Sequence, residues 1–377
     1  MHLRKLKIAL IGCGQIADAH LQEIRKISSA EAVAVCDRHI DLARQAAARF
    51  GVPGTFDDAD RMLAEVRPDV VHVTTPPQSH RPLGLKVLAA GSHLYMEKPF
   101  AVDVAEADEV LDAARSASRL VCVGHDNLYD PIWEECRQIV QSGRLGRVMH
   151  VDSIQGYDLS GPFGKAFASE PDHWVHRLPG GLFQNVMSHA LYRITDFLPD
   201  DEPRVWATWF GGGAAGATPT ELRVMLRGAE VTASLMFSST FRPVQRVARV
   251  YGTRESIEVD MDGRTIRFYR QLKMPGPFAK LEAPFRHRRE AARTLRRGVW
   301  NFLRGRIHYF AGMNKLFRLF YEAVQTGGQP PIPYRDIRRT TAIMDEVFRA
   351  CEADQPQPPG PVRPESKGTP VLHPAPA

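Results

Sequence analysis

Cysteine is scarce in this sequence, and long apolar runs are absent. The 377 residues include 5 cysteines, none of them in a CxxC pair or at the spacing of a metal site, so we expect reduced structural thiols and no bound metal. No apolar run approaches the length of a transmembrane helix, and the chain enters its first strand without a cleavable leader. These absences argue against a membrane-spanning or disulfide-rich protein and predict a cytoplasmic one.

Clusters of like charge are scarce outside one segment. The chain has a net charge of +6, with 24% charged and 44% hydrophobic residues, a balance typical of globular chains, and it is long enough for two domains. Arginines gather between Arg286 and Arg306. Such clusters occur where proteins meet nucleic acid, anionic lipid or phosphorylated substrates, but most are solvated helix faces. We predict no nucleic-acid partner.

A glycine-rich turn follows the first apolar run. Ile8 to Ile11 read as a buried strand, and a helical segment begins after the turn. In a dinucleotide-binding turn, Gly12 would permit the tight bend, Gly14 would let the pyrophosphate approach the backbone, and Ala17 would allow close helix packing. The helix N-terminus adds free N–H groups for the phosphates. The same predicted cofactor loop includes Gln15 and Ile16.

An aspartate ends the second apolar run at the position that a ribose-binding carboxylate requires. Asp37 follows the strand Ala32 to Cys36 and stands about twenty residues beyond the glycines, where it can accept both ribose hydroxyls. The alternative is that Asp37 caps the next helix. Arg38 could stack on adenine or pair with a 2′-phosphate, so NAD is predicted and NADP stays open.

A polar loop ends the strand Asp69 to Val73. Thr74, Thr75 and Pro76 open this loop, which lies at the carboxyl edge of the predicted sheet, where ligands of open α/β sheets bind. We therefore assign all three to the cofactor site.

Strands and helices alternate up to residue 125 and then change pattern. Residues 1–125 predict a doubly wound parallel sheet of about six strands. Residues 126–354 predict an α+β domain with a large, mainly antiparallel open sheet, because strands follow one another around a single helix over 181–197. The strands expected there are 148–154, 204–210, 222–226, 231–237, 246–251 and 257–259. A terminal helix over 338–351 should pack back on the first domain, and the proline-rich residues 355–377 should be disordered.

Three motifs in this order resemble one protein family. GCGQIA at 12–17, EKPF at 97–100 and PGGLFQNVMSH at 179–189 are similar to the motifs of the glucose-fructose oxidoreductase, inositol dehydrogenase and MocA (Gfo/Idh/MocA) family over about residues 5–350. The resemblance implies a Rossmann domain followed by an open sheet that commonly pairs subunits. It therefore implies a homo-oligomer, a dimer or tetramer. His80 is a cofactor contact by the same resemblance.

Lys98 is the residue to which the resemblance assigns the chemistry. The family's motif lysine lies between nicotinamide and substrate, where it binds the hydroxyl and assists its proton transfer. An ammonium near the developing alkoxide makes physical sense, because moving a hydride from an alcohol carbon also requires loss of the hydroxyl proton. The family often has a cis bond before the residue corresponding to Pro99, and Glu97 would position the loop beside the cofactor. The alternative is a surface Glu-Lys pair before a turn.

His189 is the second catalytic candidate, with Asn185 four residues before it. On one helix the two side chains would share a face, and a histidine can relay a proton near neutral pH. The family frequently has aspartate where this chain has Asn185, and an amide can orient a hydroxyl but cannot take a proton. A hydrogen-bonded buried histidine is the alternative for His189.

The connector over 157–177 has the polar and aromatic side chains of a sugar-binding loop. The predicted substrate contacts in it are Tyr157, His173, Trp174 and Arg177, against the alternative of a surface loop with incidental aromatics. The resemblance adds His125 and Asp126, although the family commonly has asparagine at the position of Asp126.

An extra helical stretch lies between Phe278 and Phe320. Its arginines alternate with apolar positions, so it could lie on an anionic membrane or cover the second sheet with its arginines reaching water. Packing is the favoured interpretation of the two.

The prediction is an NAD(P)-dependent oxidoreductase that acts on a hydroxyl or keto carbon of a sugar or nucleotide sugar, in glycan or natural-product biosynthesis. One alternative is an enzyme that retains NAD and uses transient oxidation for elimination or glycoside hydrolysis. A cyclitol dehydrogenase and a non-catalytic dinucleotide sensor are the others.

Overall fold

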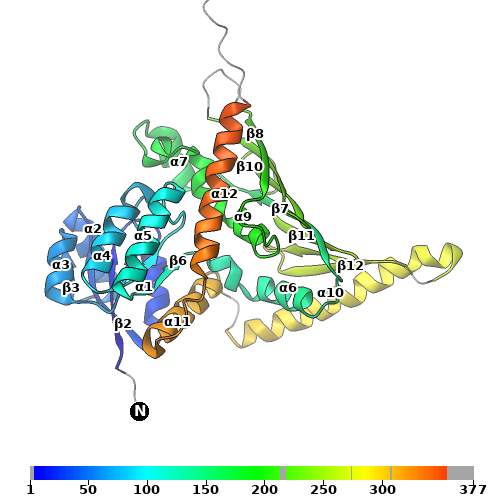
Figure 1. Cartoon of the computed structure of the whole chain (residues 1–377). Coiled ribbons are helices and arrows are strands. Elements are labelled where there is room, and N and C mark those ends of the chain that lie inside the picture. The colour runs from blue at the N-terminus through cyan, green and yellow to red at the C-terminus, as the bar shows by residue number, and fades with distance from the viewer. Residues whose placement is uncertain (1–3, 213–217, 273, 306–307, 355–377) are drawn as a thin grey trace, which may run out of the picture.

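The computed structural model describes residues 4–212, 218–272, 274–305 and 308–354. Figure 1 shows two sheets side by side, with a long terminal helix between them and a second long helix projecting from the far edge. The tail over 355–377, expected to be disordered, lies outside the described residues.

The first sheet is parallel and six-stranded, in the order β3-β2-β1-β4-β5-β6. Its strands are β1 (Leu6–Ile11), β2 (Ala30–Cys36), β3 (Gly54–Phe56), β4 (Val70–Val73), β5 (His93–Met96) and β6 (Val121–Val123). The connecting helices are α1 (Ala17–Arg25), α2 (Ile40–Phe50), α3 (Ala59–Val66), η1 (Pro77–Ser79), α4 (His80–Ala89) and α5 (Val104–Ala117). The strand order reverses between β1 and β4, and ligands bind at the carboxyl ends of the strands beside such a reversal.

The second sheet has seven strands in the order β13-β12-β11-β7-β10-β9-β8. These are β7 (Val148–Gly156), β8 (Arg204–Phe210), β9 (Glu221–Arg227), β10 (Thr232–Ser238), β11 (Arg246–Gly252), β12 (Glu255–Asp260) and β13 (Thr265–Arg270). Among the described strands of this sheet, only β7 and β10 pair in parallel, so the predicted fold class is confirmed. The sequence prediction missed β13, because at this edge strand only Ile266 is buried and the apolar signal is weak.

Two local predictions were wrong. The connector over 157–177 is not a simple loop: it contains α7 (Pro162–Ser169) and η3 (Trp174–Arg177), and Pro162 stands in the first turn of α7, where its missing N–H costs nothing. The helix expected over 181–197 is divided at Met187 into α8 (Gly181–Val186) and α9 (Ser188–Thr195). The tight bond from Ala190 N to Met187 O, 2.9 Å long, starts the second helix anew.

The remaining helices include α12 (Tyr334–Ala353), which lies between the two sheets (Figure 1). They are η2 (Asp126–Tyr129), α6 (Pro131–Gln141), η4 (Gly276–Phe278), α10 (Ala279–Leu303), α11 (Ala311–Thr326) and α12 (Tyr334–Ala353). The carboxylate of Asp345 on α12 accepts from Val104 N at 2.8 Å, and Arg339 donates to Leu198 O at 2.9 Å. Helix α12 therefore holds the first domain at one face and the second at the other.

Helices α10 and α11 differ in the burial of their apolar side chains. Phe317, Phe320 and Tyr321 of α11 are fully buried in the core of the first domain. Large apolar side chains of α10 remain exposed, although the helix lies along β13 and pairs with α6. Helix α11 is therefore a buried packed element, whereas α10 packs along one face only. Among the described residues, no helix has the length and apolar character needed to span a bilayer.

Candidate active site

The turn after β1 requires one glycine and leaves space over another. Gly12 has φ +101°, and a Cβ there would lie 2.7 Å from Thr75 Cγ2, so a side chain would clash with the neighbouring loop. A Cβ on Gly14 would meet nothing within 4 Å. The exposed backbone at Gly14 and the N-terminus of α1 therefore fit a pyrophosphate group. Gln15 is exposed and Ile16 half-buried beside them.

Asp37 is held at the end of β2 by two backbone groups. Its Oδ2 accepts from Cys13 N at 2.8 Å and its Oδ1 accepts from His39 N at 2.9 Å. Each carboxylate oxygen has a second lone pair, so both can still accept a ribose hydroxyl. Arg38 is exposed, and its Nε contacts His39 Nε2 at 3.2 Å.

The loop after β4 is fastened to the glycine turn. Thr74 is buried and donates from Oγ1 to Gly12 O at 2.6 Å. Thr75 accepts from Ser79 Oγ at 2.7 Å, and Pro76 is exposed. Thr75 and Pro76 are therefore accessible to a ligand, whereas Thr74 holds the conformation of the loop.

His80 links two loops from inside the protein. Its Nε2 lies 2.8 Å from Thr75 O, its Nδ1 lies 2.9 Å from Pro99 O, and the ring is fully buried. Burial lowers its pKa. Because both nitrogens face backbone carbonyls, the structure places His80 behind the cofactor loop rather than on its open side.

Lys98 follows β5 at the carboxyl edge of the sheet. Its Nζ donates to the backbone oxygen of Asn185 at 3.0 Å, which brings the end of α8 to the lysine. Burial lowers the pKa of Lys98, and the negative charges of Glu97 and Asp126 oppose that shift. The Lys98–Pro99 peptide bond is cis, in agreement with the expectation from the family.

A chain of buried hydrogen bonds runs from Glu97 to Tyr321. His20 Nε2 lies 3.0 Å from Glu97 Oε1, His20 Nδ1 lies 2.9 Å from His72 Nδ1, and His72 Nε2 lies 2.9 Å from the Tyr321 hydroxyl. A proton on His20 Nε2 lets the ring donate to the Glu97 carboxylate. Sequence reasoning gave His20 no role, and its only signal was a histidine three residues beyond Ala17 on α1.

Glu97 stays ionised behind Lys98. Burial alone would raise the pKa of Glu97, but His20 and the charge of Lys98 outweigh it, and the pKa lies below its usual value. Glu97 Oε2 also accepts from Lys98 N at 3.1 Å. A Cβ on Gly124 would lie 2.8 Å from Glu97 Oε1, so the residue that follows β6 must be a glycine for the carboxylate to fit.

His189 opens the second helix of the divided pair. Its Nδ1 lies 2.7 Å from the Tyr192 hydroxyl and 3.3 Å from Asn127 Nδ2. Both neighbours are donors, so the ring proton belongs on Nε2. Burial, and then the charge of Lys98, lower the pKa of His189 well below its usual value. The neutral ring can therefore donate from Nε2. Asn185 is buried on α8 and meets Lys98 through its backbone.

Asp126 and His125 follow β6 on the same edge. Burial raises the pKa of Asp126 to about 7, with Glu97 adding to the shift and Lys98 opposing it. Its buried Oδ1 has no hydrogen-bond partner among the described residues. Burial lowers the pKa of His125 to about 3, and its ring lies 4.6 Å from that of Tyr192. Asp126 is therefore the carboxylate of this edge whose pKa lies near neutral pH. The amino-acid sequence alone did not indicate this property.

The connector reaches the cofactor edge. Gln78 Nε2 of η1 donates to Trp174 O at 2.9 Å, and the rings of His173 and Trp174 lie 5.4 Å apart. Tyr157 is half-buried behind them. Arg177 is exposed and donates to Asp172 O at 2.7 Å. Its guanidinium therefore stabilises the turn between these two residues. Across the described residues, no group of three His, Cys, Asp or Glu side chains is arranged to hold a metal ion.

Comparisons with known proteins match both domains. A model described as "Oxidoreductase family, NAD-binding Rossmann fold" matches residues 6–125, and one for the GFO/IDH/MocA C-terminal domain matches residues 133–258. The D-apiose dehydrogenase of Paraburkholderia graminis is 25% identical over 92% of this chain and 88% of that protein. The D-glucoside 3-dehydrogenase of Escherichia coli is 34% identical over 38% of this chain, and the match spans only 41% of that enzyme.

Solved structures share the fold across both domains. The WlbA dehydrogenase of Bordetella pertussis, determined with NADH and UDP-GlcNAcA, has a TM-score of 0.75 at 20% identity and covers 93% of this chain and 96% of its own. The UDP-N-acetylglucosamine 3-dehydrogenase GnnA of Acidithiobacillus ferrooxidans has a TM-score of 0.70 at 20% identity, covering 93% and 98%. With both family models matched in order, the chain belongs to the Gfo/Idh/MocA family of NAD-binding oxidoreductases.

Proposed function

We propose that the protein transfers a hydride between NAD and a hydroxyl-bearing carbon of a sugar or nucleotide sugar. The observation that carries this is the meeting of Lys98, Asn185 and the ring of His189 at the edge that holds the glycine turn. Relatives named as D-apiose and D-glucoside 3-dehydrogenases support a carbohydrate substrate. The WlbA complex with UDP-GlcNAcA supports the nucleotide-sugar class.

Different residues of the chain would bind the cofactor and move the proton. Gly12, Gly14 and Asp37 would hold NAD, which when bound accepts the hydride from the substrate carbon. Lys98 would hold the substrate oxygen and, as the hydride leaves, take up its proton while passing one of its own ammonium protons to a neighbouring base. His189 would donate from Nε2 to the same oxygen and stabilise its developing charge.

Asp126 would complete the proton path. Its pKa of about 7 and its unpartnered buried oxygen fit a group that takes the proton from Lys98. Oxidation then yields a ketone, a reduced cofactor and one proton, and reduction runs the same steps in reverse. The carboxylate form is needed for oxidation and the acid form for reduction.

Asp37 supports NAD over NADP. Its carboxylate is fixed where the ribose hydroxyls arrive, and a 2′-phosphate would meet like charge there. Arg38 points to His39 instead of this position.

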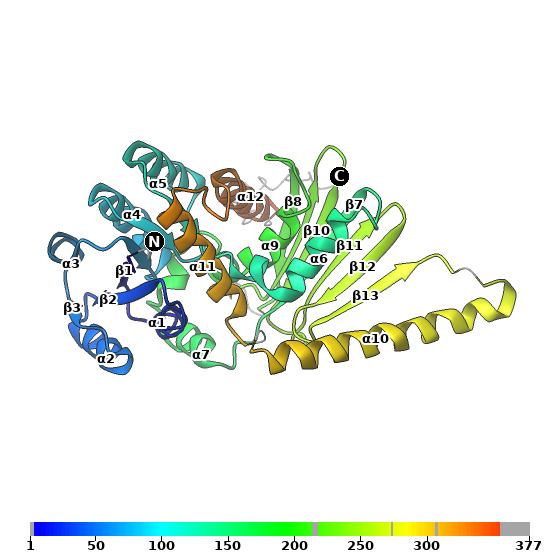
Figure 2. The ribbon, with the colours of Figure 1, turned by 90° about the horizontal axis from the view of Figure 1, so that it is seen from below.

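The open face of the second sheet supports pairing with a second copy. Helices α9 and α12 lie against the other face (Figures 1 and 2). On the open face Trp206 and Met225 are register partners and remain 41% and 56% exposed. Light scattering of the purified protein tests this, with Met225→Glu expected to lower the measured mass.

The function is tested by following NADH absorbance with free sugars, cyclitols and nucleotide sugars. Turnover of one carbohydrate class supports the proposal, and turnover of cyclitols alone would redirect it. If no substrate is oxidised and NAD remains bound through purification, an enzyme that retains its cofactor replaces simple dehydrogenation.

A further inference from the structure

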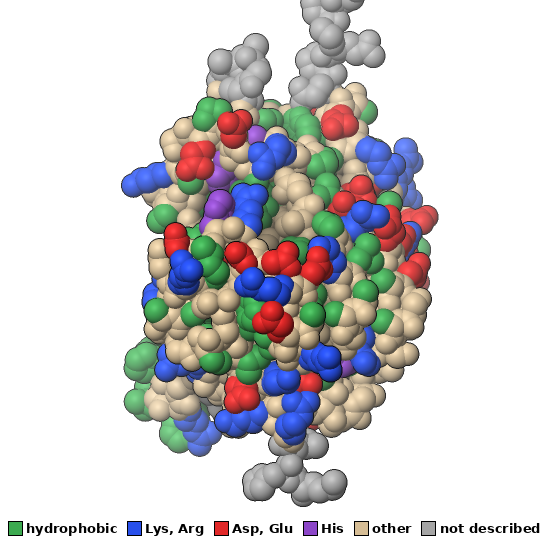
Figure 3. Space-filling view, turned by 90° about the vertical axis from the view of Figure 1, so that its left-hand side faces the viewer, with side chains coloured by type: hydrophobic (Ala, Val, Ile, Leu, Met, Phe, Trp, Pro, Cys, Tyr) green, Lys and Arg blue, Asp and Glu red, His purple; other side chains and the backbone are tan. Residues whose placement is uncertain are grey.

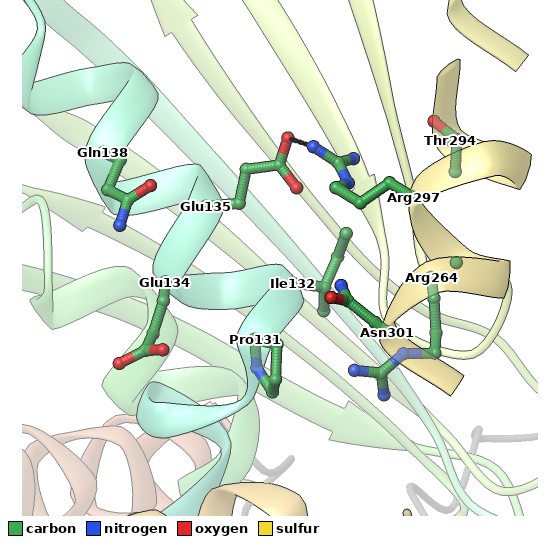
Figure 4. A pocket seen from close by; sticks show the side chains of 10 residues that line it. Pro131, Ile132, Glu134, Glu135, Gln138, Arg264, Thr294, Arg297 and Asn301 are labelled. Atoms are coloured by element: carbon green, nitrogen blue, oxygen red, sulfur yellow. Dashed lines mark hydrogen bonds and ion pairs between the residues drawn. The ribbon is translucent and has the colours of Figure 1, made fainter. Parts of the chain in front are cut away.

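The face of α10 that meets the protein is polar. Arg286 is buried there and lies 3.5 Å from Glu282, and Arg297 forms an ion pair with Glu135 of α6. A cavity of about 300 Å³ separates the two helices. Figure 4 shows polar side chains around it, with Glu134 and Gln138 on α6 and Thr294 and Asn301 on α10. The polar face of α10 is therefore joined to α6 by the ion pair of Arg297 with Glu135.

The face of α10 that turns to solvent carries large apolar side chains, with the exposed Arg288 among them. Six large side chains form what we call the apolar stripe, and each is more than half exposed: Leu281, Phe285, Leu295, Val299, Phe302 and Leu303. At the helical repeat they fall within an arc about 100° wide, the width of the buried face of an ordinary amphipathic helix. Large apolar patches exposed to water in this way mark surfaces that bind a partner or a membrane.

The stripe lies among positive charges. Seven basic and two acidic side chains stand in α10. In the part of the chain that the structure describes, Arg289, Arg293 and Arg296, which lie beside the stripe, form no ion pair. Figure 3 shows the opposite character on the face of the first domain, where basic and acidic side chains are interspersed. Positive charge and exposed apolar surface thus coincide on one element.

The helix is placed to reach a flat surface. It runs beside β13 at the edge of the sheet, and its N-terminal end projects beyond that sheet, on the side away from the first domain (Figures 1 and 2). Its 25 residues span about 38 Å. The candidate active site lies where Lys98 of the first domain meets α8 and α9 of the second, and no residue of α10 contributes to it.

We propose that α10 binds the surface of an anionic lipid bilayer. Its apolar stripe would enter the boundary between headgroups and acyl chains, as amphipathic interfacial helices do, and the flanking arginines would pair with lipid phosphates. The polar face stays on the protein, so docking requires no unfolding. The helix is too polar to span the bilayer and lies parallel to it.

A second copy fits the same surface less well. Two α10 helices that pair through their stripes in an isologous contact bring Arg288 and its arginine neighbours against the same residues of the partner. Unpaired like charges in an interface oppose association. An anionic bilayer supplies the opposite charge.

The test uses the full chain and vesicles of 30% phosphatidylglycerol in phosphatidylcholine, with pure phosphatidylcholine vesicles as the reference. We expect sedimentation with the anionic vesicles, roughly tenfold stronger than with neutral ones at low salt, and falling as salt is added. Leu295→Glu should weaken binding by roughly tenfold, and replacement of Arg289, Arg293 and Arg296 by Gln should remove the salt dependence.

Leu42→Glu is the matched control. It adds the same charge at a residue of α2 that is 38% exposed, and it should bind vesicles as wild type does. Failure of the full chain to sediment with anionic vesicles overturns the proposal, and so does equal loss in both glutamate variants. A dimer that Leu295→Glu dissociates, without vesicle binding, assigns the stripe to a second copy.

Discussion

His20 Nε2 lies 3.0 Å from Glu97 Oε1, and this contact joins the first helix after the glycine turn to the residue that precedes Lys98. The contact is buried, and it is extended through His72 to the hydroxyl of Tyr321. The carboxylate behind the lysine is therefore stabilised by a donor from another element. The position of the lysine depends on that donor.

Replacing His20 by Ala should lower kcat/KM more than a loss of stability explains. The change removes one hydrogen-bond partner from Glu97 Oε1 and one from His72 Nδ1, which costs about 1–3 kcal/mol for each buried atom left unpaired. The pKa of Glu97 should rise, so the acid limb of the pH–rate profile moves to higher pH. His20→Gln, which restores a donor, should recover part of the rate.

Tyr321→Phe provides the control for that variant. It removes the far end of the chain and leaves the contact between His20 and Glu97. We expect reduced thermal stability with an unchanged pH–rate profile. An equal shift of the profile in both variants would contradict a specific role of His20.

Asp126 should make oxidation depend on pH near neutrality. Its pKa in the folded protein, about 7, lies above its ordinary value of 3.8, so oxidation should rise as pH passes through 7, because the carboxylate accepts the proton. Asp126→Asn should lose that limb. A rising limb retained in Asp126→Asn would assign the limb to another group.

The raised pKa of Asp126 also makes the stability of the folded protein depend on pH. A carboxyl whose pKa is raised on folding contributes stability at pH below 4, and that contribution is lost as pH rises to 7 and above. Asp126→Asn has no carboxyl at this position and therefore does not lose this stability as pH rises. Its melting temperature relative to wild type should therefore be higher at pH 8 than at pH 4, which differential scanning calorimetry measures.

Asp37→Ser should weaken NAD and relax the choice of cofactor. Loss of charged hydrogen bonds to the ribose costs about 1.5–3 kcal/mol, or roughly 10- to 100-fold in the KM for NAD. The KM for NADP should fall, because like charge no longer meets the 2′-phosphate. Arg38→Ala serves as the comparison and should leave the KM for NAD unchanged.

Much of the cofactor edge was readable in the sequence because its parts are local. The apolar strand before Gly12, the aspartate after the second strand and the EKPF motif each carry their signal within a few residues. The contact of His20 with Glu97 joins residues 77 positions apart, and no local pattern encodes it. Periodicity gave the amphipathic character of α10, but it could not tell which face would meet the protein, because that depends on the ion pair between Arg297 and the distant Glu135 of α6.

Turnover by Lys98→Ala tests the central claim most directly. On a substrate that the wild type oxidises, we predict that kcat falls about 100- to 10,000-fold with NAD binding retained by fluorescence titration. Lys86→Ala, which removes an exposed lysine paired with Asp60, should keep wild-type turnover. Near-normal oxidation by Lys98→Ala, with its fold intact, would contradict hydride transfer assisted at this lysine.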